Sequence, residues 1–182
     1  MEPWTVERGR AIAQSLVGSL GRRWDHTVQV ARRAEDLVAA GADPAVALAA
    51  WLHDIGYAPS VARTDLHALD GARHLSILGA PREVVSLVAY HTGAEFEAVE
   101  RGLASELHAF DRPDQAALDA LTLADLTTDP AGGVVGVDER LAEILQRYPA
   151  DHPVHRAIEK SSPYLRECAQ RAATMFDRVA GT

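Results

Sequence analysis

The chain of 182 residues is 47% hydrophobic and carries 18 basic and 26 acidic side chains, which give a formal net charge of −8. The hydrophobic content excludes a disordered chain, and the lack of any basic run interleaved with aromatic residues argues against a nucleic-acid polymer as partner. The length is most simply one domain over residues 1–182, with enough apolar surface for a core without disulfides.

Good helix formers dominate, and apolar residues recur with a period close to 3.6 along the whole chain. The predicted helices, most of them closed by a glycine, cover in chain order residues 5–20, 25–40, 43–54, 66–78, 80–92, 95–109, 113–127, 137–148 and 151–179. The Asp43-Pro44 pair suits the N-cap and first turn of the third helix, and the segment 129–136 is a clear loop. Pro163 is expected to kink or split the last helix. The sequence therefore predicts an all-α, single-domain bundle of roughly eight or nine helices.

The features that report on cellular location favour the cytoplasm. Cys168 is the single cysteine, which excludes an internal disulfide and indicates a reducing environment. The first residues lack the basic and apolar regions of a secretory signal, and no apolar stretch is long enough to cross a membrane. We therefore expect a cytoplasmic protein without a membrane partner.

An adjacent imidazole and carboxylate stand at the end of the most apolar predicted helix. In the stretch AWLHDIGYAP, residues 50–59, the helix runs directly into His53 and Asp54 before stopping at Gly56. Burying either group without a partner costs several kcal/mol, roughly 2–7 for an unpaired polar group. The imidazole and the carboxylate therefore both require a polar or charged partner in the folded protein.

Two further polar groups lie on buried faces of predicted helices. His26 is near the start of the second helix, and Asp125 shares one helical stripe with Leu118 and Leu121. Polar groups on three helices can satisfy one another by sharing a cation. Two imidazoles and two carboxylates form a mixed nitrogen and oxygen set, which suits a divalent Fe, Mn, Zn, Co or Ni ion rather than a thiolate site.

The segments DHTVQVA, AWLHDIGYAP and LTLADLTTD occur in that order on helices. With them, the chain resembles the HD-domain superfamily of metal-dependent phosphohydrolases from about residue 24 to about residue 128. The resemblance implies an all-helical HD-type bundle, with the N-terminal helix 5–20 and C-terminal helices 138–179 packed on the core. It also implies that one metal ion is bound by the family's four ligands, here His26, His53, Asp54 and Asp125.

A second ion is favoured by the stretch DLHALDGARHLSILGAPREVVSLVAYHTGA. It resembles the segment that supplies second-metal ligands in dinuclear HD proteins, where one histidine opens a helix and another closes the next. The matching pair here is His67 and His91, and two antiparallel helices with a short turn would bring them together. Asp54 could then bridge two ions. The alternative is a mononuclear site, with His67 as a helix cap and His91 on a polar edge.

The chain departs from the family pattern at Tyr57. Many relatives carry a lysine immediately after HDIG, where it meets a substrate phosphate. Arg63, Arg73 and Arg140 are candidates to replace that cation, together with Tyr57 itself as a substrate contact. The plainer interpretation of all three arginines is that they lie on the surface.

The function implied by the resemblance is metal-dependent hydrolysis of a nucleotide or another small phosphate ester or anhydride through a metal-activated water. His53 and Asp54 would lie at the catalytic centre, with Asp54 accepting the proton of the water. One alternative is a mixed-valent di-iron oxygenase of the same superfamily, which would use the same six ligands. Another is a non-catalytic ligand-sensing domain, disfavoured because a binding module has no need for four inward polar groups.

Overall fold

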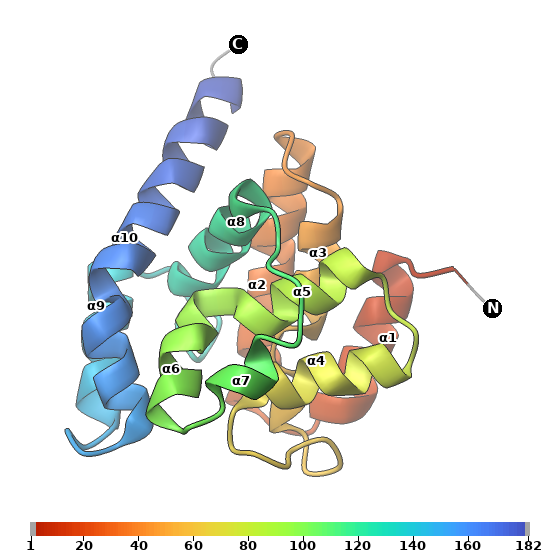
Figure 1. Ribbon diagram of the computed structural model, residues 1–182. Coiled ribbons are helices and arrows are strands. Elements are labelled where there is room, and N and C mark those ends of the chain that lie inside the picture. Colours follow the sequence, from red (N-terminus) through yellow and green to blue (C-terminus); the bar gives the residue numbers. More distant parts are fainter. Residues whose placement is uncertain (1–2, 181–182) are drawn as a thin grey trace.

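The structure, a computed structural model, describes residues 3–180, so residues 1–2 and 181–182 at the ends of the expected domain lie outside it (Figure 1). Within residues 3–180 there are ten α-helices, two short 3₁₀ helices and no β-strand. The predicted all-α fold class is therefore confirmed. No helix in the described part of the chain combines the length and the apolar character needed to span a membrane.

The helices follow one another with short connections. In chain order they are α1 (Val6–Val17), α2 (Arg22–Ala39), α3 (Ala45–Leu52), η1 (Ile55–Tyr57), α4 (His67–Ile77), α5 (Arg82–Tyr90), η2 (His91–Gly93), α6 (Ala94–Glu100), α7 (Ala104–Leu107), α8 (Gln115–Leu126), α9 (Val137–Arg147) and α10 (Pro153–Ala180).

Two local differences from the expected pattern have physical reasons. The predicted helix 95–109 is two helices, because Gly102 adopts a left-handed backbone with φ of +71° and ends α6. This split raises the number of α-helices by one. Pro163 does not split the last helix: α10 runs unbroken for 28 residues and packs against α8, α6 and α9. The start of α3, by contrast, agrees with the expected pattern. Asp43 Oδ1 accepts a hydrogen bond from Ala45 N at 2.8 Å, as the N-cap role of Asp43 predicts.

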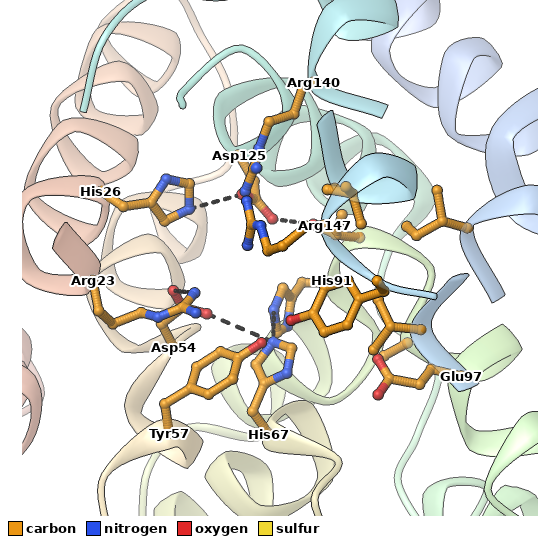
Figure 2. Close-up of a pocket in the computed structure, with 16 residues that line it drawn as sticks. Arg23, His26, Asp54, Tyr57, His67, His91, Glu97, Asp125, Arg140 and Arg147 are labelled. Carbon is orange, nitrogen blue, oxygen red and sulfur yellow. Dashed lines mark hydrogen bonds and ion pairs between the residues drawn. The ribbon is translucent and has the colours of Figure 1, made fainter. Parts of the chain in front are cut away.

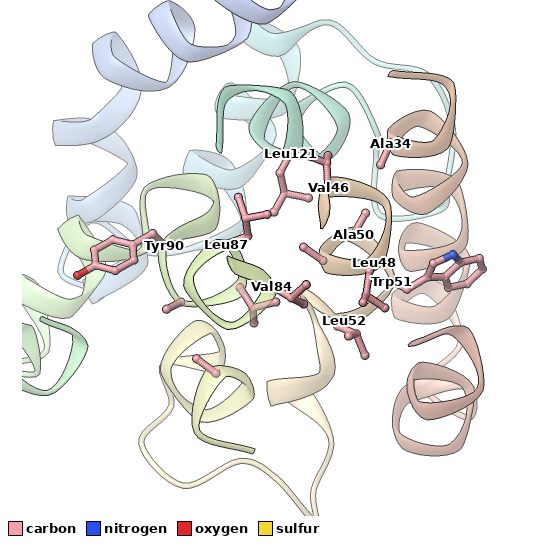
Figure 3. Close-up of a cluster of buried hydrophobic side chains, with 14 of the residues drawn as sticks. Ala34, Val46, Leu48, Ala50, Trp51, Leu52, Val84, Leu87, Tyr90 and Leu121 are labelled. Carbon is pink, nitrogen blue, oxygen red and sulfur yellow. The ribbon is translucent and has the colours of Figure 1, made fainter. Parts of the chain in front are cut away.

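The core is built around α3. Seven of its eight residues are buried, because the helix is apolar on every face and packs against α1, α2, α5 and α8. Figure 3 shows its side chains meeting Leu87 of α5 and Leu121 of α8. Each fully buried leucine contributes about 1.5–3 kcal/mol. Since His53 and Asp54 follow α3 directly, the chain delivers both polar groups to the interior.

The C-terminal helices bury a smaller apolar cluster of their own. It joins α9 and α10 to the end of α8, and consists of Leu126, Leu141, Ile144, Ile158 and Leu165. This packing holds α9 beside the end of α8 that carries Asp125. One wall of the site described below is therefore made by α9.

We predict that Gly56 is required for the close approach of η1 and α4. A Cβ atom at position 56 would lie 1.9 Å from the carbonyl oxygen of His67, and both sides of the contact are backbone. The two segments would have to separate, so we expect Gly56→Ala to lower the free energy of unfolding by about 1–3 kcal/mol. Chemical denaturation measures this change.

The matched control is Gly136→Ala, at the start of α9. There the nearest atom to an added Cβ is the flexible end of the Glu139 side chain, at 3.3 Å. We expect a change within about 0.5 kcal/mol, because this side chain can move aside. Equal destabilisation by the two substitutions would contradict the proposed role of the η1–α4 contact.

Candidate metal centre

Five of the six predicted ligands line one cavity and His53 lies directly behind it, so five separate parts of the chain meet at the site (Figure 2). His26 lies in the second turn of α2, His53 is the C-cap of α3, and Asp54 precedes η1. The remaining three lie at the start of α4, the end of α5 and the last turn of α8; they are His67, His91 and Asp125. His53 lies deepest, with its ring centroid 5.6 Å from that of His26 and 5.3 Å from that of His91.

Three of the histidines are oriented by main-chain carbonyl groups. Their Nδ1 atoms lie 2.7–3.0 Å from carbonyl oxygens, in the pairs His26–Asp129, His53–Ala50 and His91–Val88. A carbonyl oxygen only accepts, so each Nδ1–H donates. His53 and His91, when neutral, therefore keep a lone pair on Nε2, whereas His26 also donates from Nε2 to Asp125 and presents its lone pair only once that proton is lost. Metal-ligating histidines are usually held in this way.

The buried Nε2 atoms are placed to bind a cation. His53 Nε2 has no hydrogen-bond partner among the described residues, and it is enclosed in the interior. Leaving such an atom unpaired costs about 1–3 kcal/mol. His67 Nε2 lies 3.1 Å from His91 Nε2, where it can donate to the His91 lone pair, and with its proton on Nδ1 instead both rings can direct lone pairs to one cation. These donors therefore fit a divalent transition-metal ion, and their mix of nitrogen and oxygen suits Fe, Mn, Zn, Co or Ni.

The ligand atoms fall into two sets of three, each with its atoms within 4.8 Å of one another. The first triad is His26, His53 and Asp125, and the second triad is Asp54, His67 and His91. Asp54 lies between them, with Oδ2 at 3.5 Å from His53 Nε2 and Oδ1 at 3.6 Å from His67 Nε2. The resemblance assigns Asp54 to the first ion and allows it to bridge to a second, and this geometry places it where a carboxylate can serve two ions.

Both carboxylates are held in the ionised form. Burial raises the pKa of Asp54, but the charges of His53, Arg23 and His67 together bring it below its usual range. Burial likewise raises the pKa of Asp125, but the hydrogen bond and charge of His26, together with His53 and Arg140, hold the pKa well below the usual value. The site therefore presents two anionic oxygen ligands at neutral pH.

The second triad keeps its histidines neutral. Burial and then the charge of His91 hold the pKa of His67 well below its ordinary value, and burial lowers the pKa of His91. His26 differs: burial lowers its pKa, but the hydrogen bond and charge of Asp125, together with the charge of Asp54 and the Asp129 carbonyl, raise it more. Neutral rings are the form in which histidine binds metal ions.

Thr92 supports Asp125 at a cost in backbone strain. Its φ of +47° is in the left-handed region, which is unusual for a β-branched residue. In this conformation its hydroxyl donates to Asp125 Oδ2, while Oδ1 lies 3.0 Å from His26 Nε2. Sequence reasoning missed Thr92, because strain at a threonine leaves no sequence signal.

Arg23 supplies a cation near the position where relatives carry a lysine. It donates to Asp54 Oδ2 at 2.8 Å, and its guanidinium lies 3.7 Å above the Tyr57 ring. Tyr57 in turn stacks on His67 at 4.1 Å. The sequence did contain a signal for Arg23, which precedes His26 by three residues and so shares its helix face.

Of the three arginines selected from the sequence, the structure brings only Arg140 to the cavity. Arg63 is exposed on the loop before α4 and donates to nearby carbonyl oxygens, and Arg73 pairs with Glu106 of α7. Neither lines the cavity, since the α4 face that carries Arg73 is turned towards α7. Two residues that sequence reasoning did not select also line it, namely Glu97 and Arg147.

Fold and site together define an all-helical protein with a candidate histidine–aspartate metal centre. The family model described as HD domain matches residues 23–127, more than half of the chain. No curated protein and no solved structure matches the chain. The chain therefore belongs to the HD-domain superfamily of metal-dependent phosphohydrolases, and this membership implies binding of a divalent metal ion.

We predict that the first triad binds one metal ion. Removing His53 or Asp125 deletes a ligand and leaves the others incompletely paired, so His53→Ala and Asp125→Ala should each lose about one ion per chain. Elemental analysis of purified protein, reconstituted with Mn²⁺ and freed of excess metal, gives the stoichiometry. Wild-type metal content in both variants would show that these residues are not ligands.

The second triad is predicted to bind a separate ion. His67→Ala and His91→Ala should each lose about one ion per chain and retain the ion of the first triad. His108→Ala is the control, because His108 is exposed and belongs to neither triad. Full wild-type stoichiometry in both variants would leave a mononuclear site and remove the basis for a bridging Asp54.

Proposed function

We propose that this protein is a metal-dependent phosphohydrolase that acts on a nucleotide or another small phosphate ester or anhydride. The observation that carries the proposal is the meeting of the two triads with a cluster of arginines in one cavity. An outer chamber of about 490 Å³ continues from the site, and its lining includes Arg22, Arg23, Arg140 and Arg147. Guanidinium groups beside a metal centre favour phosphoryl oxygens, and the volume suits a small molecule rather than a polymer.

The residues of the chain divide the task between them. A bound divalent cation would lower the pKa of a coordinated water and polarise a phosphoryl oxygen. His53, buried behind the cavity, would anchor the first triad and make no contact with the substrate. Asp54 lies between the triads and would accept a hydrogen bond from the attacking water. Because its pKa is held low, Asp54 is better suited to ligation and orientation of the water than to storage of its proton.

Arg23 would neutralise charge on the phosphoryl group. Its guanidinium is held by Asp54 and by the ring of Tyr57, so it needs little reorganisation when a substrate binds. Tyr57 thus contributes by fixing a cation rather than by supplying one. The same six ligands would serve a di-iron oxygenase equally well, but the arginines of the outer chamber favour a phosphorylated substrate.

We predict hydrolysis without oxygen. Protein loaded with Mn²⁺ or Fe²⁺ should release phosphate from at least one nucleotide or small phosphate ester under strict anaerobiosis, because a metal-activated water needs no oxidant. In ¹⁸O-labelled water, the label should appear in the phosphate when that phosphorus is attacked. Mass spectrometry of the product measures this incorporation.

The same activity should fall at least about a hundredfold in His26→Ala and Asp125→Ala, which ties it to this site. The exposed His108→Ala variant should keep it. A broad panel of phosphate esters and anhydrides left intact, together with O₂ uptake on an organic substrate, would replace the phosphohydrolase with the oxygenase.

A further inference from the structure

The wall of the cavity made by α9 carries two arginines that the metal centre does not use. Arg140 and Arg147 are two helical turns apart, and Glu143 lies between them on the same face of α9. Both arginines line the inner cavity as well as the outer chamber. Figure 2 shows both side chains reaching the cavity on the side of Asp125. All of α9 lies beyond residues 23–127, the part that matches the HD domain.

Arg140 is the unusual member of this pair. The residue is only 6% exposed, and its Nε–H has no hydrogen-bond partner among the described residues. Its Nη1 donates to Glu143. A buried guanidinium with an unused donor is costly. The guanidinium therefore calls for a further acceptor, and the Arg140 side chain lines the cavity in which one can bind.

The Glu143 carboxylate is shared by the guanidinium groups of Arg140 and Arg147. Arg147 donates to Glu143 Oε1 from Nε at 2.9 Å and from Nη2 at 2.5 Å, while Arg140 donates to the same carboxylate. Two guanidinium groups and one carboxylate leave a net positive charge on this face of α9. Glu143 also holds the two guanidinium groups near each other, which prepares them for an anion with several oxygen atoms.

We propose that Arg140 and Arg147 form an anion subsite for a second phosphoryl group of the substrate, next to the group held at the metal centre. The inference deepens the proposed function, on which it rests, and selects phosphoanhydrides and bisphosphorylated molecules over simple monoesters. A phosphoryl group has enough oxygen atoms to accept from Arg140 Nε and from Arg147 at once. Its position along the path from the inner cavity to the outer chamber follows from the shared lining of the two spaces.

The test uses inorganic pyrophosphate as the probe and binding as the readout. Calorimetric titration of chelator-treated, metal-free protein should show one pyrophosphate per chain, bound more tightly than inorganic phosphate. Arg147→Gln and Arg140→Gln should each weaken pyrophosphate binding by roughly tenfold or more, since each removes charge-assisted hydrogen bonds. Arg147 is the safer variant for folding, because its side chain is 34% exposed.

We expect Glu143→Gln to change the affinity for pyrophosphate in the opposite direction. Removing the carboxylate that competes for both guanidinium groups should tighten pyrophosphate binding several-fold, a gain that a purely structural role of the arginines does not produce. Arg166→Gln is the matched control and should leave binding unchanged, because Arg166 pairs with Asp138 on the exposed surface.

The outcomes separate the two proposals. Undetectable pyrophosphate binding by the wild-type protein, or equal binding by wild type and both arginine variants, overturns the subsite even if hydrolysis is observed. Arginine-dependent binding without hydrolysis of any phosphate ester or anhydride overturns the proposed function and supports an anion subsite.

Discussion

The site depends on hydrogen bonds from imidazole Nδ1–H groups to main-chain carbonyl oxygens. His53 and His91 bond the carbonyl groups three residues before them, at the C-terminal ends of α3 and α5. Carbonyl groups in the last turn of a helix have no partner within it, so each ring satisfies one and at the same time directs Nε2 into the cavity. The same hydrogen bond thus completes the end of the helix and orients the candidate ligand.

The third such bond links distant parts of the chain. His26 is oriented by the carbonyl of Asp129, 103 residues later, in the loop between α8 and α9. This loop is well defined: the Asp129 side chain accepts from the backbone N–H groups of Ala131 and Gly133, and Thr128 pairs with Val134. Because the same loop leads into α9, the orientation of a metal ligand and the position of the arginine wall are set by one segment.

Much of the fold and the meeting of the candidate ligands could be predicted from the sequence, because helix periodicity and the HD-type motifs are local patterns. The all-apolar α3 predicted that His53 and Asp54 would be buried, and two antiparallel helices with a short turn predicted the approach of His67 and His91, whose Nε2 atoms lie 3.1 Å apart. What could not be predicted depends on tertiary packing. The backbone of Thr92, the main-chain carbonyl that orients His26 and the burial of Arg140 carry no signal in a single sequence.

The apolar cluster shared by α9 and α10 has a consequence for how the protein can change. All six candidate ligands lie within residues 23–127, whereas Arg140 and Arg147 come from a helix outside them, whose packing is largely separate from the core around α3. In the proposed function, chemistry and selectivity would therefore be carried by different stretches of chain. Substitutions along α9 can alter which molecule is accepted while the reaction centre stays intact, so new specificities can evolve, or be engineered by grafting, through one helix.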